Sequence, residues 1–232
     1  MFIFVRPTCN VVYKLIFFLI LAFGINYNSF SITVGSDDSL RIAIFPKSVG
    51  NKKWKILVGL DARRSFFQTQ KVKINGIRLG VQYKGVHRFG FGFYSLSKKI
   101  EFKNFVVDKA DAQNPTSVLV DVNYNSLFYE RVFLKTKKWE ISFPLHLGKG
   151  LFKRQYLNNL GNYKQWDKKS FSVFNVGFQV KYYIFTWFAP RISFGYRHTY
   201  KTLPEIQEAF NKPYYAFGLS ISLGELFRSI FN

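Results

Sequence analysis

The sequence predicts an all-β fold: an eight-stranded antiparallel up-and-down β-barrel that spans a membrane. Three observations predict it. Apolar residues alternate with small or polar residues in short runs, most clearly in 213–223. Hydrophobic residues make up 48% of the chain, yet beyond the N-terminal segment no apolar run is long enough for a spanning helix. Short and long connections between the runs alternate, which places all tight turns at one end of a barrel.

The first 31 residues have the features of a secretory signal peptide. Arg6 and Lys14 give a basic start, 15–24 is an apolar core, and 29–31 is a small-x-small cleavage pattern. The apolar core is shorter than a spanning helix requires, although an uncleaved helical anchor remains an alternative. We therefore expect 1–31 to be removed on export.

Export leaves a chain without cysteine, because Cys9 is the only one and precedes the apolar core. The net charge of +21 would suit a nucleic acid or an anionic surface. Export argues against the nucleic acid, which leaves the phosphates of an outer leaflet or simply solvated loops as the alternatives. We interpret 32–52 as a periplasmic leader, 53–223 as the transmembrane barrel, and 224–232 as a C-terminal tail.

The predicted strands each have one apolar face and one small or polar face. In the last run, Phe217 and Leu219 alternate with Gly218 and Ser220. We expect the apolar faces to meet lipid, whereas a soluble lipocalin-like barrel would turn them inward. The runs are 54–64, 74–83, 87–96, 118–134, 139–148, 171–182, 187–200 and 213–223.

One of these runs is longer than the others. The run 118–134 exceeds the length of a tilted spanning strand, so its beginning is expected to project and pair with 100–107. Its face carrying Val120 and Val122 is assigned to lipid, and the face carrying Asp121 and Arg131 to the lumen.

The fifth strand and two of the connections have further features. Pro144 lies within the fifth strand and suggests a bulge there. Residues 149–169 are expected to form a long basic loop, and 204–210 a helical turn capped by Thr202 and Glu205.

Tryptophans begin three of the strands, all at the short-turn end. There they would form an aromatic girdle at the headgroups. The three residues are Trp54, Trp139 and Trp187.

An eight-stranded barrel has a lumen just wide enough to be filled by side chains. Charged residues on the inward faces are therefore expected to pair with one another as a lumen charge network. Its predicted members are Asp61, Arg63, Arg78, Arg88, Asp121, Arg131, Glu140, Lys181, Arg191 and Arg197.

With its alternating strands, 75–80 (NGIRLG) and 88–94 (RFGFGFY), the chain resembles the small eight-stranded outer-membrane barrels of the OmpX and OmpA-barrel type, in the style common in Bacteroidota. The resemblance implies the outer membrane of a Gram-negative bacterium. It also implies insertion by the barrel-assembly machinery, because the terminal strand resembles the signal that this machinery reads. The chain differs from the usual pattern in continuing past that strand.

Some barrels of this size are enzymes on lipid A that use a histidine with a serine and an acid. His87, His146 and His198 do not form such a pattern, because no His-x-Ser occurs. We therefore predict a non-enzymatic barrel without metal or cofactor, with a structural, adhesive or lipopolysaccharide-contacting role. A small-solute pore and a lipid A-modifying enzyme are the alternatives.

Outer-membrane lipid and lipopolysaccharide are the predicted partners, together with a partner protein that the sequence does not identify. The predicted loop 149–169 would offer its cations to lipopolysaccharide phosphates. The candidate contacts are Lys153, Arg154, Lys164 and Lys168.

Overall fold

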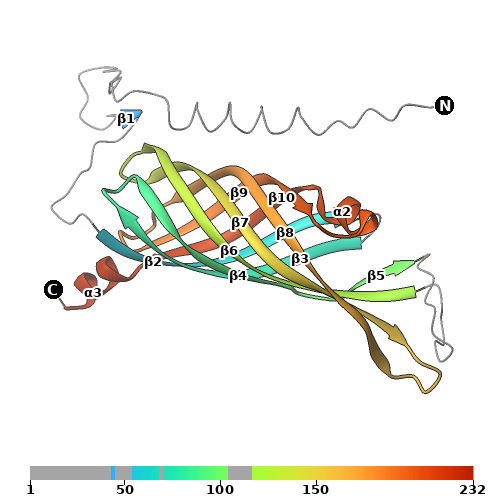
Figure 1. The fold of residues 1–232 in the computed structure, drawn as a ribbon. Coiled ribbons are helices and arrows are strands. Elements are labelled where there is room, and N and C mark those ends of the chain that lie inside the picture. Colours follow the sequence, from blue (N-terminus) through green and yellow to red (C-terminus); the bar gives the residue numbers. More distant parts are fainter. Residues whose placement is uncertain (1–42, 45–53, 68–69, 104–116, 232) are drawn as a thin grey trace, which may run out of the picture. The chain divides into compact units, whose positions relative to one another are not determined.

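The computed structural model describes residues 43–44, 54–67, 70–103 and 117–231. The predicted signal peptide lies outside these residues, as does the predicted leader apart from 43–44. Almost all of the described chain is β-structure (Figure 1). The elements are β1 (Ala43–Ile44), β2 (Trp54–Phe67), β3 (Gln70–Tyr83), β4 (His87–Leu96), β5 (Ile100–Lys103), β6 (Ser117–Lys135), β7 (Trp139–Leu157), β8 (Tyr163–Tyr182), β9 (Phe188–Tyr200), α2 (Pro204–Phe210), β10 (Pro213–Ser222) and α3 (Leu223–Phe231).

Eight of the described strands close into a ring. β2, β3 and β4 pair in sequence order, and so do β6 to β10. β4 pairs with β6, and β10 pairs with β2, which completes the circle. Every pair is antiparallel, so the fold is the predicted up-and-down barrel. β5 pairs with the beginning of β6, as expected, and β1 pairs with its end.

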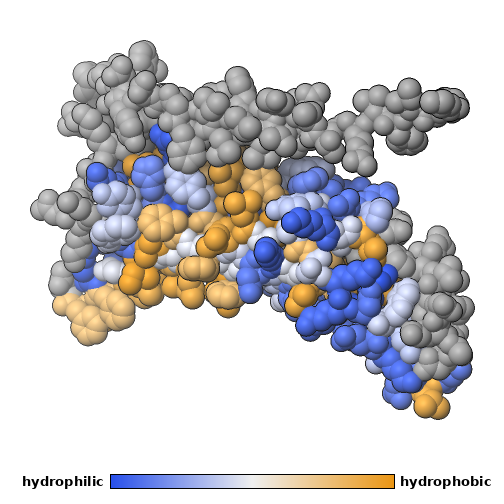
Figure 2. Space-filling view, in the orientation of Figure 1, coloured by the Kyte–Doolittle hydropathy of each residue, from blue (hydrophilic) through white to orange (hydrophobic). Residues whose placement is uncertain are grey.

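The polarity of this barrel is reversed relative to a soluble one. On β4, Phe91 is 60% exposed and points outward, whereas Arg88 is 2% exposed and points into the lumen. Apolar side chains gather over the half of the wall nearest α3, and polar ones over the β7–β8 hairpin (Figure 2). An apolar outer wall around a polar interior is the arrangement of a transmembrane β-barrel. The exposed apolar side chains include Leu60, Ile77, Leu79, Phe89, Phe93, Leu127, Leu147, Phe178, Phe194 and Phe217.

Three tight turns join strands at one end of the barrel, as the connection lengths predict. They lie at 84–86, 136–138 and 183–187. In the first, Lys84 and Gly85 have φ of 50° and 75°, a left-handed conformation that glycine adopts without strain. In the second, the Trp139 amide donates to Thr136 Oγ1 at 2.9 Å.

The predicted faces of β6 are wrong. Val120 and Val122 are buried inside, together with Tyr124 and Val132, whereas Asp121 lies on the outer side. For Val120 and Val122 the physical reason is that the beginning of β6 projects beyond the apolar belt. There the interior is a hydrophobic core and the outer side meets water, so the apolar face is the inner one.

The prediction that 149–169 forms a basic loop is also wrong, because most of these residues belong to β7 and β8. β7 and β8 continue past the barrel rim and form a long hairpin, visible at the lower right of Figure 1. Its turn is closed by Asn158, whose Oδ1 accepts hydrogen bonds from the amides of Leu160 and Asn162 at 3.1 and 2.7 Å. Gly161 takes a left-handed φ of 74° there.

A hydrophobic core fills the barrel at the long-loop end. It joins the inner residues of β6 to Phe152 of β7, Phe171 of β8 and Phe210 of α2. The rings of Phe152 and Phe210 are 5.4 Å apart, so α2 packs into the mouth of the barrel. The helical turn at 204–210 is thus confirmed. Its N-cap, however, is Leu203 and makes no side-chain cap bond, so the predicted cap is absent.

Two further predictions need correction. The bulge expected at Pro144 lies instead across the ladder, in β6 between Val132 and Leu134. The C-terminal tail contains α3, which Lys55 of β2 holds through an ion pair with Glu225 at 2.6 Å. No helix among the described residues is long and apolar enough to cross a membrane.

Candidate functional site

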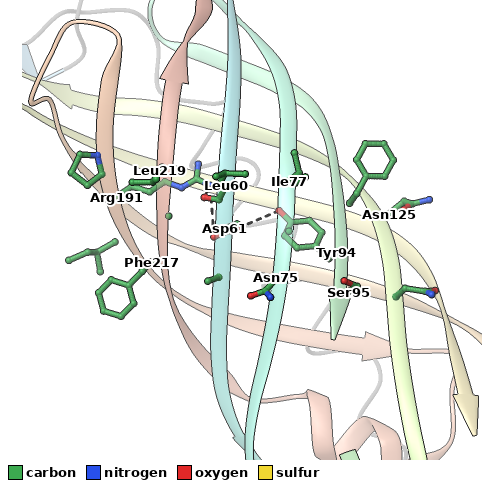
Figure 3. Close-up of a pocket in the computed structure, with 17 residues that line it drawn as sticks. Leu60, Asp61, Asn75, Ile77, Tyr94, Ser95, Asn125, Arg191, Phe217 and Leu219 are labelled. Atoms are coloured by element: carbon green, nitrogen blue, oxygen red, sulfur yellow. Dashed lines mark hydrogen bonds and ion pairs between the residues drawn. The ribbon is translucent and has the colours of Figure 1, made fainter. Parts of the chain in front are cut away.

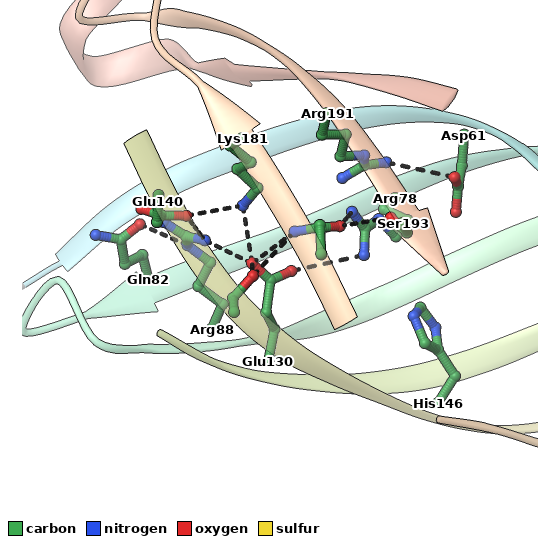
Figure 4. A network of polar contacts seen from close by, with 12 residues as sticks. Asp61, Arg78, Gln82, Arg88, Glu130, Glu140, His146, Lys181, Arg191 and Ser193 are labelled. Carbon is green, nitrogen blue, oxygen red and sulfur yellow. Dashed lines mark hydrogen bonds and ion pairs between the residues drawn. The ribbon is translucent and has the colours of Figure 1, made fainter. Parts of the chain in front are cut away.

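Two carboxylates organise the lumen near the tight turns, in a cluster that we call the carboxylate network (Figure 4). Arg88 of β4 donates hydrogen bonds from both terminal nitrogens to the two carboxylate oxygens of Glu140 of β7, at 2.5 and 2.6 Å. Its Nη1 also reaches Glu130 of β6 at 2.5 Å, and its Nε donates to Gln82 at 2.7 Å. A bidentate guanidinium–carboxylate pair is among the strongest protein hydrogen-bond arrangements.

Glu130 is the centre of this network. Its Oε1 also accepts from Lys181 Nζ at 2.8 Å, Ser142 Oγ at 2.9 Å and Gln179 Nε2 at 2.9 Å. Arg78 approaches the other oxygen at 3.7 Å. All five side chains are buried, so each charge depends on these partners in place of water.

The turn between β8 and β9 contributes a further hydrogen bond to the carboxylate network, from its tight-turn side. The Tyr183 hydroxyl donates to Glu140 Oε2 at 2.9 Å. Burial, and secondly the adjacent Glu140 carboxylate, raise the pKa of the Tyr183 phenol, so it stays protonated and keeps donating. Glu140 therefore has both oxygens occupied.

A second group of polar side chains lies above the carboxylate network, and we call it the arginine–tyrosine layer. Arg63 donates to Asp61 at 3.0 Å, to the Tyr94 hydroxyl at 2.7 Å and to His146 Nε2 at 3.2 Å. Tyr94 and Tyr124 stack at 4.8 Å between their ring centroids. The Tyr94 ring fits only because Gly76 faces it, since a Cβ there would overlap the ring.

The lumen is therefore filled in three levels. The carboxylate network lies at the tight-turn end, the arginine–tyrosine layer follows, and the hydrophobic core lies at the long-loop end. Along β7 these levels are represented by Glu140, His146 and Phe152, which are all buried.

The structure brings eight of the ten predicted network residues into the lumen. Asp121 and Arg131 are the exceptions, because they belong to the outer side of β6. The guanidinium of Arg131 lies 5.7 Å from the Phe133 ring. Glu130 was missing from the predicted network, because the predicted faces of β6 were reversed and placed Glu130 on the outside. In the structure it lies in the lumen. Those inside are Asp61, Arg63, Arg78, Arg88, Glu140, Lys181, Arg191 and Arg197.

Aromatic residues surround the tight-turn end. Trp54 begins β2 and Trp139 begins β7, and each is more than half exposed. Each packs on a tyrosine of the neighbouring strand, Tyr83 and Tyr182, at 4.6 and 4.8 Å. Trp187 precedes β9 and stacks on Phe185 at 5.4 Å.

The β7–β8 hairpin separates the predicted basic contacts into two groups. Lys153 and Lys168 are register partners, so both point to the outer side. Lys164 is exposed near the turn. Arg154 points to the other side, where it is buried, pairs with Asp167 and lies 4.4 Å from the Trp166 ring. Arg154 is therefore not available to an external anion.

The three histidines lie in three different environments. His87 contacts the Tyr129 hydroxyl at 2.9 Å, His146 is buried beside Arg63, and His198 is exposed and stacks on Tyr200. Within the described residues, no group of three histidine, cysteine, aspartate or glutamate side chains is placed to hold a metal.

A depression on the wall crosses several strands at one level (Figure 3). Its lining alternates between outward apolar residues such as Leu60 and Phe217 and inward residues such as Asp61 and Arg191. The lining therefore includes residues of both the outer and the lumen side of the barrel wall.

No protein-family model matches the chain, and no curated protein matches it. Several solved structures are similar to this chain, among them the following three. The N-terminal β-barrel domain of Pseudomonas aeruginosa OprF is 13% identical, with 74% of this chain and 98% of that domain covered and a TM-score of 0.46.

The other two are the attachment invasion locus protein Ail of Yersinia pestis and the Neisserial surface protein A. Ail is 13% identical, with coverage of 73% and 96% and a TM-score of 0.40. The Neisserial protein is 11% identical, with coverage of 73% and 97% and a TM-score of 0.42. These values transfer no residue role to this chain, and the resemblance to Bacteroidota barrels stays a prediction.

Proposed function

We propose that this chain is a sealed, non-enzymatic barrel of a Gram-negative outer membrane that binds lipopolysaccharide phosphates through the outer side of its β7–β8 hairpin. The tight turns and α3 then lie in the periplasm, and the hairpin lies at the cell surface. The barrel-assembly machinery would insert it.

The position of the lysines along β7 supports this proposal. Leu147 is the last large exposed apolar residue of the strand, and Lys149 and Lys153 follow on the same side. At about 3.3 Å per residue, Lys149 lies about 7 Å and Lys153 about 20 Å beyond Leu147 along the tilted strand. With the strand tilted by about 40°, Lys149 falls within the headgroup layer and Lys153 on its water side, where its long side chain can reach toward phosphates.

The observation that carries the proposal is a pair of like charges. Lys153 and Lys168 are directly opposite each other on the outer side of β7 and β8. Like charges in that position destabilise a sheet unless an anion lies between them. Asp121, the β6 partner of Lys153, supplies one negative charge to the row, and a phosphate group would supply more.

The filled lumen argues against a pore. Glu130, Arg88 and Glu140 link β4, β6 and β7, and Lys181 extends the contacts to β8. An ion crossing the barrel would have to break these bonds.

Binding of purified lipopolysaccharide by the folded protein tests the proposal. We expect a variant with Lys153→Gln and Lys168→Gln to bind at least about tenfold more weakly at low salt, with the difference shrinking as salt rises. Lys137→Gln with Lys138→Gln removes the same charge at the opposite end and should bind like the wild type. Equal, salt-independent affinity in all three proteins would refute the proposal, and dephosphorylated lipid A should lose the difference.

A further inference from the structure

A buried arginine in the lumen has no hydrogen-bond partner among the residues that the structure describes. Arg197 of β9 is 1% exposed, and its three guanidinium nitrogens donate no hydrogen bond to any of these residues. Its register partner on β8, Asn175, is 0% exposed, and neither its amide nitrogen nor its amide oxygen is hydrogen-bonded. Two such groups side by side form an incomplete site, since buried polar groups are nearly always hydrogen-bonded.

The neighbours of Arg197 do not neutralise it. Its guanidinium carbon lies 5.6 Å from the Tyr214 ring centroid and 6.0 Å from that of Phe210. Arg63, a second cation, lies 5.4 Å from the same Tyr214 ring. A ring face attracts a cation but does not satisfy the five N–H groups of a guanidinium.

The nearby carboxylate is already engaged. Asp61 pairs with Arg63 at 3.0 Å and lies 3.9 Å from Arg191. The row His146–Asn175–Arg197 runs across β7, β8 and β9 on the lumen side, and His146 already accepts a hydrogen bond from Arg63.

The net charge of the lumen also favours a bound anion. Among the buried side chains of the described barrel, cations outnumber carboxylates. Removing a charge from water is costly unless a counter-charge replaces the water, so the excess of cations calls for an anion. Within the barrel ring the buried cations are Arg63, Arg78, Arg88, Lys181, Arg191 and Arg197, and the buried carboxylates are Asp61, Glu130 and Glu140. Arg154, a further buried cation, lies in the β7–β8 hairpin and is paired with Asp167.

We propose that the lumen holds a small inorganic anion, such as chloride, phosphate or sulfate, bound by the guanidinium of Arg197 and the amide NH₂ of Asn175, with Arg63 adding positive charge from across the Tyr214 ring. The Arg197 guanidinium and the Asn175 amide would both donate hydrogen bonds to the anion, and hydrogen bonds to an ionised acceptor are stronger than those between neutral groups. The carboxylate network closes the site on one side and the hydrophobic core on the other. The anion therefore enters while the barrel folds and exchanges slowly afterwards.

Refolding the full chain into detergent tests this proposal. The buffer contains sodium gluconate, a bulky organic anion, and chloride, phosphate or sulfate replaces it at constant ionic strength. We expect one of the three to raise the unfolding temperature of the wild type by about 5 °C or more when it is saturating. After transfer back to gluconate, ion chromatography should find close to one retained anion per chain.

Variants of the two arginines on β9 give the matched comparison. Arg197→Met should lose both the temperature shift and the retained anion, and in gluconate it should be at least as stable as the wild type, because it removes an uncompensated charge. Arg191→Met removes a lumen arginine that donates to the Leu60 carbonyl at 2.9 Å, so it should lose stability but keep the anion response. Arg197→Lys, which keeps the charge without the planar fork, should bind more weakly.

Two outcomes overturn the proposal. In the first, wild type and Arg197→Met respond equally to every anion, which would place the effect elsewhere on this basic chain. In the second, the wild type neither responds to nor retains any of the three anions, which would mean that water alone completes the site. If Arg197→Met does not fold, Arg197→Lys and the retained anion of the wild type still decide the question.

Discussion

Replacing Glu130 by glutamine should destabilise the barrel more than any neutral change on its surface. Glutamine keeps the volume but removes the charge that Arg88 and Lys181 approach at 2.5 and 2.8 Å. Its amide nitrogen would also face Arg78, which lies 3.7 Å from the second carboxylate oxygen. Because the site is buried, we expect a loss of about 3 to 5 kcal/mol, the usual cost of breaking a buried ion pair on one side.

The free energy of unfolding can be measured by urea titration of the refolded protein, read from the shift in gel migration between folded and unfolded barrels. Glu208→Gln, an exposed change on α2, is the control and should stay within about 0.5 kcal/mol of the wild type. A double variant with Arg88→Met should lose less than the two single variants together, since the residues share one interaction. A loss below about 1 kcal/mol for Glu130→Gln would refute the view that Glu130 organises the lumen.

Three further predictions concern the wall, the lumen and the C-terminal helix. Phe91→Arg should reduce the stability of the barrel in lipid by about 2 to 4 kcal/mol near the bilayer midplane, and an unchanged urea midpoint would contradict a lipid-facing position. The wild-type protein in planar bilayers should give no large, steady ionic current, because side chains fill the lumen, and such a current would show that it is open. Glu225→Gln removes the ion pair with Lys55 and the one with Arg228 at 3.4 Å, so trypsin should cleave after Arg228 faster than in the wild type, and equal rates would mean that other contacts hold α3.

The strand order and most of the wall could be predicted because the membrane imposes a simple rule. Where a strand lies within the bilayer, its outer side must be apolar, and Phe89, Phe91 and Phe93 obey this rule on β4. Lys84–Gly85 marks a tight turn, and from one such turn the direction of the neighbouring strands follows.

The same rule fails where a strand leaves the bilayer, and β6 shows why. Near its end Glu130 points inward and Leu127 outward, as in lipid. Near its beginning Val120 points inward and Asp121 outward, as in a soluble protein. A single strand thus obeys both rules in turn, and a sequence does not mark the point of change.

The pairing of charges could not be predicted either, because it depends on register. That Arg88 reaches both carboxylates whereas Arg197 reaches none follows from which residues share a level in the lumen. Both arginines have the same local pattern, an inward cation between outward aromatic or polar residues. Only the closed ring distinguishes them.

The closure of the ring by its first and last strands constrains how the molecule forms. Leu57 to Arg64 pair with Tyr215 to Ser222, which are among the most distant parts of the barrel sequence. The ring cannot close before the last strand is available, so a sheet formed earlier would have two unpaired edges. Loop-closure entropy is paid before that final pairing contributes, which makes closure the slow step. A chain that ends before β10 would therefore be an open sheet with an apolar outer face, a substrate for proteases or aggregation and not a smaller barrel.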